Sequence, residues 1–453
     1  MNPHTREPGA DGADGRRLAR WLAPERWGRH AAFFGGAVLT GIIAVAFARG
    51  SDLALRLFRG AAAAELWWPW IAPPLGIALL AWLSRRFFPG AQGSGIPQTI
   101  AALSLPSAEA RNSLLSMRIA LGKFFLTLGA IACGASVGRE GPTVQIGASV
   151  MHSIGRLARF PAVDLDRGLI LAGGAAGIAA AFNTPLAGVV FVIEELSRSF
   201  EERTSGTILT AVIVAGVTSV AFLGNYTYFG STQASLSDAR MWLAVPLCGV
   251  VGGLAGGVFA RLMLRLRRGL PGRLGRLQAS RPVYFALACG VVIAVLGWAC
   301  GGTTLGTGYG EARALVQQEA APTLWFPAAK AGATLASYAT GIPAGIFAPS
   351  LAVGAGLGGA LSLAVHVAPA GALVVLCMAA YFSGVVQAPL TALVIVGEMT
   401  DNRALTLPLM AVAFLGRGAS ALVCRESLYR ALAAGFIASA RPAAGPSPTQ
   451  PGH

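Results

Sequence analysis

Long apolar stretches recur along the whole chain and constrain its fold more than any other feature. They cover residues 31–48, 70–83, 119–137, 168–193, 206–223, 241–260, 283–300, 345–365, 371–397 and 405–423. Several are shorter than the roughly 20 residues that a straight membrane helix needs, or are interrupted by glycine or proline. Charged residues make up only 12% of the chain, against about 25% in an ordinary soluble domain. We therefore predict an all-α polytopic membrane protein with broken and tilted helices.

The strong positive charge does not indicate nucleic-acid binding. The formal net charge is +15, but the arginines lie between the apolar runs, where the cytoplasmic loops of membrane proteins carry them. We therefore expect the lipid bilayer as a partner and no nucleic acid.

The cysteines and the chain ends predict no further chemistry. The six cysteines lie in or beside apolar runs without metal-ligand spacing, so we expect small packing residues and no metal, cofactor or disulfide. Residues 1–30 are polar and arginine-rich and lack the apolar core of a signal peptide, which predicts an N-terminal arm. Residues 436–453 are predicted to form a disordered tail.

The chain contains an internal repeat. The matched pairs are 134–147 with 341–354 at an offset of 207, 183–195 with 387–399 at 204, and 93–97 with 306–310 at 213. The offset of 207 also relates Lys123 to Lys330, which are the only two lysines. Because the matches occur in the same order, we predict a duplicated chain. The first membrane repeat covers 31–225, and the second, with a final helix, covers 240–435.

The charge of equivalent loops gives their orientation. The stretch 261–281 carries seven arginines and no acid, whereas 49–69 carries three arginines against Asp52 and Glu65. The positive-inside rule therefore makes 261–281 a cytoplasmic loop and 49–69 an external one, with the N-terminus cytoplasmic. Equivalent loops on opposite sides make an inverted-topology repeat, an architecture whose binding site lies near the membrane midplane.

Three segments rich in glycine and proline predict helix starts inside the membrane. They are Gly93–Pro97, Gly138–Pro142 and Gly345–Pro349. A helix that begins there leaves its first N–H groups unpaired, and the helix dipole adds about half a positive charge. Such a terminus binds an anion without lysine or arginine, and weakly enough for release. For GSGIP alone, close helix packing explains the glycines equally well.

Glu140 is a carboxylate within an apolar run. Ionisable residues in a membrane are costly and are functional by default, so Glu140 is the first candidate for a working group. The alternative is a structural ion pair with Arg139. Adjacent residues on a helix point in different directions, however, so mutual neutralisation is not assured.

Two more acids, Glu194 and Glu195, end an apolar helix. The repeat matches Glu194 with Glu398, which indicates a structural role for that pair. It matches Glu195 with Met399, so Glu195 is the asymmetric member and the better functional candidate. For both acids the alternative is a solvated helix end.

The two lysines and the GASVG motif are predicted to have structural roles and no catalytic role. Lys123 and Lys330 are cations at equivalent places, which we expect to be structural and bonded to carbonyl groups at helix breaks. GASVG (134–138) fits the nucleophile motif of hydrolases, yet it lies in a membrane run without the required strand–turn–helix context. We therefore expect no enzyme activity and no catalytic residue, with a membrane-embedded hydrolase using Ser136 as the alternative class.

GSGIP, GREGP and GIFAP, in that order, resemble the three signature segments of the CLC family of chloride channels and chloride/proton antiporters. The resemblance covers residues 31–435 and is to the bacterial type, because no cytoplasmic regulatory domain follows residue 430. It implies an inverted-repeat helical fold, a homodimer with one pore per subunit, and anions as substrate. It also implies a multi-pass protein of the bacterial inner membrane.

The resemblance further implies an anion site. The Ser94 hydroxyl would bind a central anion, the N–H groups of Ile346 and Phe347 would line the site, and Tyr429 would complete it. Without the family, Tyr429 reads as an interfacial aromatic near a helix start. The expected anion-binding set is Ser94, Gly95, Ile96, Glu140, Gly141, Ile346, Phe347 and Tyr429, while Arg139, Lys123 and Lys330 are expected to be structural.

Glu140 and Glu195 match the two glutamates of the family that handle protons. In the family the gating glutamate, here Glu140, occupies an anion position when charged and swings out when protonated. Glu195 matches the internal glutamate that passes protons in exchangers and is generally replaced in channels. The resemblance therefore implies chloride/proton exchange, with a passive voltage- or pH-gated chloride channel as the alternative.

Two positions bear on selectivity and on the proton path. Gln98, Thr99 and Ile100 stand where some exchangers carry acids, so a relay to Glu195 must use water or another group. Ser94 implies a preference for chloride over nitrate, since nitrate-favouring relatives tend to carry proline there. The fluoride-selective relatives also depart at this position.

Overall fold

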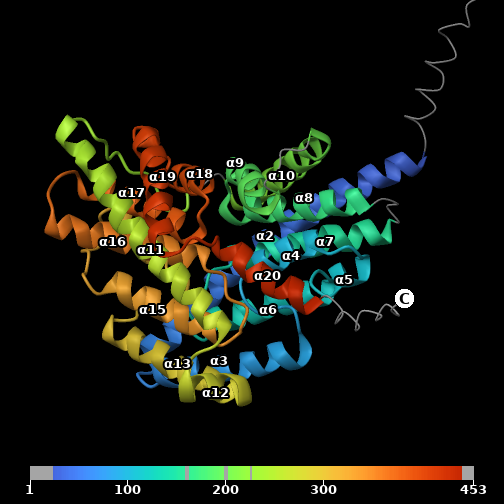
Figure 1. The fold of residues 1–453 in the computed structure, drawn as a ribbon, viewed down its shortest axis with the longest axis horizontal. Coiled ribbons are helices and arrows are strands. Elements are labelled where there is room, and N and C mark those ends of the chain that lie inside the picture. The colour runs from blue at the N-terminus through green and yellow to red at the C-terminus, as the bar shows by residue number, and fades with distance from the viewer. Residues whose placement is uncertain (1–23, 159–162, 198–201, 225–226, 441–453) are drawn as a thin grey trace, which may run out of the picture.

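The computed structural model describes residues 24–158, 163–197, 202–224 and 227–440 (Figure 1). The first half forms α2 (Pro24–Ala64), α3 (Trp68–Phe87), α4 (Ile96–Ser104), α5 (Ala108–Asn112), α6 (Met117–Ala132), α7 (Glu140–Leu157), α8 (Val163–Phe182), α9 (Pro185–Phe191), a π-helical turn η1 (Val192–Ser197) and α10 (Glu202–Leu223). The second half forms a 3-10 turn η2 (Ala239–Leu243), α11 (Ala244–Arg268), α12 (Gly272–Ser280), α13 (Pro282–Ala299), α14 (Tyr309–Val316), α15 (Phe326–Ala339), α16 (Phe347–Ala364), α17 (Ala370–Val386), α18 (Pro389–Thr400), α19 (Thr406–Val423) and α20 (Leu428–Ala440). Within these ranges only isolated β-bridges accompany the helices, which confirms the all-α prediction.

Helix lengths and exposed surfaces fit a membrane environment. Seven helical stretches of the described chain are long and apolar enough to cross a membrane. On α10, Leu209, Ile213 and Val217 are 49%, 50% and 63% exposed. An outward apolar stripe at this helical spacing is what a lipid-facing helix requires. Shorter helices such as α4, α9 and α18, with 9, 7 and 12 residues, are the broken elements that the sequence predicts.

The protein core lies around α17. Every residue from Gly371 to Val386 is buried, as expected for a helix that is apolar on all sides. α17 packs against α11, α16 and α19, and all four helices lie in the same half of the molecule in Figure 1. The start of α16, which contains the GIFAP segment, therefore rests on the most buried part of the fold.

Equivalent helices begin at the offsets that relate the two halves of the sequence. The pairs of first residues are Glu140 and Phe347 for α7 and α16, Pro185 and Pro389 for α9 and α18, and Ile96 and Tyr309 for α4 and α14. The three predicted helix starts are therefore real, since Gly95, Arg139 and Ile346 are the N-cap residues of α4, α7 and α16.

The two halves meet through their broken segments. The Gly138 N–H donates to the Gly345 carbonyl at 2.6 Å, and the Gly345 N–H donates to the Gly138 carbonyl at 3.2 Å. A Cβ on Gly345 would lie 2.4 Å from the Gly138 oxygen, so this approach requires glycine. The pair is antiparallel, as equivalent segments are when a twofold axis runs across them. This is the relation expected of an inverted repeat.

The two lysines stabilise the extended stretches before α4 and α14. Lys123 Nζ donates to the Ala91 and Gly93 carbonyls, both at 2.7 Å. Lys330 Nζ donates to the Thr304 and Gly306 carbonyls at 2.9 and 2.8 Å. Both side chains are fully buried. Each ammonium group therefore satisfies carbonyls that no helix satisfies, at equivalent places in the two halves.

Two glutamates cap helices of the opposite half. Glu194 accepts the Leu390 and Thr391 N–H groups at 3.1 and 2.7 Å, in the first turn of α18. Glu398 accepts the Ala187 N–H at 2.9 Å, in the first turn of α9. Neither helix has a side-chain cap from its own N-cap residue. The two acids therefore make reciprocal contacts that hold the halves together.

The structure corrects three boundaries that the sequence suggested. The stretch 49–69 is not mainly a loop, because α2 continues to Ala64. Its residues up to that point are mostly alanine, leucine and arginine, which are strong helix formers. Much of 261–281 is also helical, within α11 and α12. The tail cannot begin at residue 436, since α20 runs to Ala440. Residues 1–23 and 441–453 lie outside the described residues.

Glu398→Ala should destabilise the protein, because the start of α9 loses its acceptor. Loss of an N-terminal cap costs about 0.5–2 kcal/mol. Glu398→Gln keeps one acceptor oxygen and should lose less. Thermal unfolding of the detergent-solubilised protein measures the difference. A Glu398→Ala protein as stable as the wild type would contradict the capping role.

Candidate functional site

The starts of α4, α7 and α16 meet at one place in the fold. The bridge between Gly138 and Gly345 joins α7 to α16. On the α4 side, a Cβ on Gly141 would lie 2.4 Å from the Ser94 hydroxyl oxygen, and a Cβ on Gly95 would lie 2.5 Å from the Gly141 carbonyl. Glycines at these positions therefore let three helix N-termini, with their partial positive charge, approach one another.

The Glu140 side chain lies against the start of α16. The carboxylate is fully buried, and its Oε2 atom accepts the Ala348 N–H at 3.4 Å. Its Oε1 atom accepts a hydrogen bond from the Tyr309 hydroxyl. α16 has no cap from its N-cap residue, Ile346, so its first N–H groups need an outside acceptor. The carboxylate of Glu140 therefore occupies a place where the backbone is built to hold an anion.

The side chain of Arg139 is anchored to α2. Its guanidinium donates to the Ala48 carbonyl at 2.7 Å and to Asp52 at 3.3 Å, and it lies 5.1 Å from the Tyr228 ring and 5.5 Å from the Tyr309 ring. The Nε atom is 3.9 Å from Glu140 Oε1. Arg139 is therefore a nearby positive charge for Glu140 but not its hydrogen-bond donor at this distance. Its shorter contacts are with α2.

Two buried hydroxyl groups face the same region. Ser94 and Tyr429 are both buried, and their hydroxyl groups approach each other, but no hydrogen bond of standard geometry joins either one to another described group. The Tyr429 ring stacks on Phe347 at 6.1 Å between ring centroids. Buried hydroxyls without partners are costly. Both can donate to an anion that lies beside them.

Backbone groups at the starts of α16 and α4 also lie near these hydroxyls. Ile346 and Phe347, at the start of α16, are 1% and 0% exposed. The Gly95 N–H is occupied, because it donates to Gln98 Oε1 at 3.0 Å. Of the predicted contributors from the GSGIP segment, Ser94 therefore offers a hydroxyl, while Gly95 and Ile96 shape the start of α4.

Glu195 lies in the π-helical turn η1, next to the cap residue Glu194. It is 1% exposed, and its Oε1 atom accepts from the Ser427 hydroxyl at 3.4 Å. Ser427 directly precedes α20, which carries Tyr429. The Tyr429 hydroxyl lies within electrostatic range of both Glu140 and Glu195. Tyr429 therefore links the surroundings of the two glutamates.

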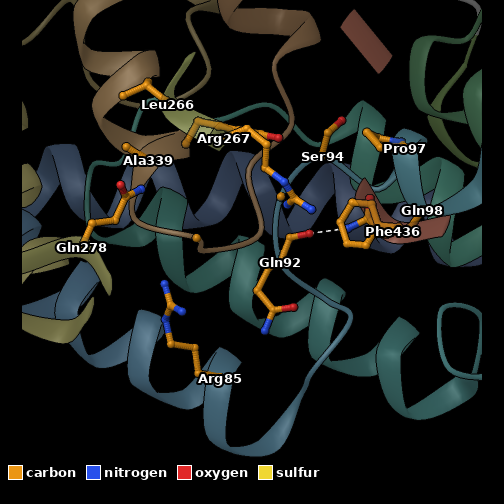
Figure 2. A pocket seen from close by; sticks show the side chains of 13 residues that line it. Arg85, Gln92, Ser94, Pro97, Gln98, Leu266, Arg267, Gln278, Ala339 and Phe436 are labelled. Carbon is orange, nitrogen blue, oxygen red and sulfur yellow. Dashed lines mark hydrogen bonds between the residues drawn. The ribbon is translucent and has the colours of Figure 1, made fainter. Parts of the chain in front are cut away.

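A cavity of about 400 Å³ reaches Ser94 from the surface near the end of α11 (Figure 2). Arg85 and Arg267 line it, and none of its thirteen lining residues is acidic. The Gln98 side chain also lines it, but it is engaged with the Gln92 carbonyl and the Gly95 N–H. The cavity therefore gives a positively charged approach to the helix starts, and such a cavity concentrates anions.

Ser136, the residue of the alternative hydrolase hypothesis, is a packing residue in the structure. It is fully buried, and its hydroxyl lies 2.9 Å from the Thr334 hydroxyl. Its N–H donates to the Ser337 hydroxyl at 3.0 Å. These contacts join the loop before α7 to α15.

Sequence reasoning did not identify Tyr309, Arg85 or Arg267 as parts of the site. Tyr309 appears in the sequence only within the weak repeat match GTGYG. Its position as the first residue of α14, equivalent to Ile96 of α4, is the signal that could have found it. Arg85 and Arg267 belong to distant helices, and only the fold brings them to one cavity.

Comparison with known proteins shows the family of the chain. The model of the voltage gated chloride channel family matches residues 75–421. The H(+)/Cl(-) exchange transporter ClcA of Yersinia pseudotuberculosis serotype IB (strain PB1/+) is 34% identical over 430 residues, covering 88% of this chain and 86% of the relative. ClcA of Cronobacter sakazakii (strain ATCC BAA-894) is 33% identical, with 82% of each chain covered.

A solved structure shares the fold. That of a slow cyanobacterial Cl-/H+ antiporter superposes with a TM-score of 0.78 at 24% identity, covering 90% of this chain and 97% of the other. Fold, signature segments and relatives agree over most of the sequence. The chain therefore belongs to the voltage gated chloride channel (CLC) family of ion transporters.

Proposed function

We propose that the protein exchanges chloride for protons across the membrane. The observation that carries the proposal is the Glu140 carboxylate, which binds the Ala348 N–H at the start of α16, where an anion would bind. A carboxylate and a chloride ion compete for the same donors. The relatives named as H(+)/Cl(-) exchange transporters support coupling of this competition to protons.

The central chloride site is formed by donors from three elements. The hydroxyls of Ser94 and Tyr429 donate from two sides, and the N–H groups of Ile346 and Phe347 donate from the start of α16. The buried, unpartnered hydroxyls support this assignment, because an anion would satisfy both of them. Dipole and hydroxyl donors hold chloride without a contacting cation, which keeps release fast. Ser94 favours chloride over nitrate.

Glu140 acts as the gate in this scheme. The charged carboxylate accepts from Tyr309 and Ala348 and so excludes an anion from the start of α16. Protonation removes the charge that the helix N-terminus attracts, and the neutral side chain leaves. Chloride then takes the vacated donors. When Glu140 releases its proton on the outer side, the carboxylate returns and displaces the anion.

Glu195 supplies the proton from the inner side. It is buried beside Ser427 and within electrostatic range of Tyr429, on the path toward Glu140. Gln98 cannot pass a proton as an acid would, and it is fixed by its contacts with Gln92 and Gly95. We therefore assign the supply of protons to Glu195 to water. Chloride enters through the cavity that Arg85 and Arg267 line.

The family supports a proposal for the assembly and the location of the protein. We propose a homodimer in the bacterial inner membrane with the N-terminus in the cytoplasm. The arginine-rich end of α11, at Arg265, Arg267 and Arg268, supports a cytoplasmic position for the cavity mouth. We propose no enzymatic activity, and the packing of Ser136 supports this.

Glu140→Ala should abolish proton coupling while chloride flux persists, because the carboxylate that accepts the Ala348 N–H at the start of α16 is removed. We expect proton transport to fall by at least about 100-fold, as when a positioned proton-transfer group is lost. Parallel recordings of proton and chloride flux in reconstituted vesicles measure both. Surviving coupled proton movement in this variant would refute the gate.

Glu195→Gln should also stop proton transport, yet leave chloride binding intact, since Glu195 lies outside the chloride site. Gln preserves size and the acceptor for Ser427. Calorimetric titration with chloride should give an affinity within about threefold of wild type. An unchanged ratio of protons to chloride in the vesicle assay would rule out the relay.

A further inference from the structure

The Tyr309 hydroxyl donates a hydrogen bond to Glu140 Oε1. Tyr309 is the first residue of α14 and is equivalent, by the repeat, to Ile96 at the start of α4. Ile96 has no polar side chain, so the duplicated frame does not explain the hydroxyl. In the first half, the apolar side chain of Ile96 fills the equivalent position without any hydroxyl group.

The ring of Tyr309 is held in place by its neighbours. Its centroid lies 4.9 Å from that of Tyr228 and 5.7 Å from that of Phe229, and the Arg139 guanidinium lies 5.5 Å from it. The preceding Gly308 has φ of +86°, a conformation that favours glycine and sets the start of α14. A hydroxyl on a ring packed in this way cannot follow Glu140 when that side chain moves.

The hydrogen bond therefore belongs to one position of the Glu140 side chain. It is the position in which Oε2 accepts the Ala348 N–H, at the start of α16. Two donors from two elements of the second half thus hold the two oxygens of one carboxylate. The Ala348 N–H, which binds Oε2, is a donor that chloride can also use. The Tyr309 hydroxyl binds Oε1 of the same carboxylate.

We propose that Tyr309 is a positioning residue that latches the Glu140 gate in its closed position, an inference that rests on the gating role proposed above. A phenol donates more strongly to a charged carboxylate than to a neutral carboxyl group. The latch therefore stabilises the charged, closed gate over the protonated, open one. It slows opening and moves opening to lower pH.

Other charged and titratable groups also lie around the gate and the latch. They are Arg139, which binds Ala48 and Asp52 and lies 3.9 Å from Glu140 Oε1; Tyr228, whose ring packs on Tyr309; Glu311, paired with Arg59 at 2.5 Å; Lys330, bound to Thr304 and Gly306; and Tyr429, stacked on Phe347. Removal of the Tyr309 hydroxyl changes none of these contacts, so its effect on pH dependence reports the latch.

Tyr309→Phe tests the proposal, because it removes the hydroxyl and keeps the ring. Chloride flux is recorded from vesicles containing the purified full-length protein, from acidic to neutral pH. We expect flux at neutral pH to rise by up to about tenfold, in line with the loss of a hydrogen bond to a charged acceptor. The pH of half-maximal flux should move upward by about one unit.

Two further variants exclude a general effect of losing a buried hydroxyl. Tyr381, in α17, is 1% exposed, and its hydroxyl has no hydrogen-bond partner among the described residues. Tyr381→Phe should leave flux and pH profile unchanged. In a Glu140→Ala background, Tyr309→Phe should add nothing, because residues that act through one contact are not additive.

The proposal is overturned if Tyr309→Phe leaves the pH profile and the flux at wild-type values, or if its effect persists without the Glu140 carboxylate. Thermal unfolding of each variant shows that the comparison is between folded proteins. The latch is tested by chloride flux, whereas exchange is tested by proton movement, so one proposal can fail without the other. A wild type that carries chloride but no protons would refute exchange and would still show whether the latch exists.

Discussion

Backbone N–H groups that begin helices inside the protein, away from water, are the constraint on which the rest of the structure depends. An unsatisfied polar group in such a place costs several kcal/mol or more. α7 and α16 start without a cap from their N-cap residues. The Glu140 carboxylate meets part of this need at Ala348, and a transported anion can meet the same need. Binding and gating therefore use one set of donors.

Residues that the two repeats share stabilise the fold, whereas the candidate functional residues are those that differ between the repeats. Lys123 and Lys330 make the same contacts in both halves, and so do Glu194 and Glu398. By contrast, Glu140 is equivalent to Phe347, and Glu195 to Met399. The lysines stabilise equivalent stretches within each half, the paired glutamates join the two halves, and the acids without an acidic counterpart remain for proton chemistry. Tyr309, equivalent to Ile96, belongs to this second group.

The sequence predicted those parts of the structure that depend on local backbone chemistry. Glycine and proline marked the starts of α4, α7 and α16, because few other residues permit such breaks. The sequence did not show that Glu398 caps α9, or that Tyr309 reaches Glu140, since these contacts join residues 211 and 169 positions apart. Tyr429 has no counterpart in the repeat, and only the family resemblance indicated it. The sequence does not show the length of α2, because its C-terminal part is not apolar enough to read as a membrane helix.

Proton movement driven by a chloride gradient alone is the most direct test of chloride/proton exchange. Purified protein is reconstituted in vesicles with a chloride gradient and no pH gradient, and the internal pH is followed. Exchange predicts that chloride leaving the vesicles drives protons into them, and that Glu140→Ala vesicles release chloride without this proton movement. Chloride release by the wild type with no proton movement would contradict it, and would make the protein a passive channel of the same fold.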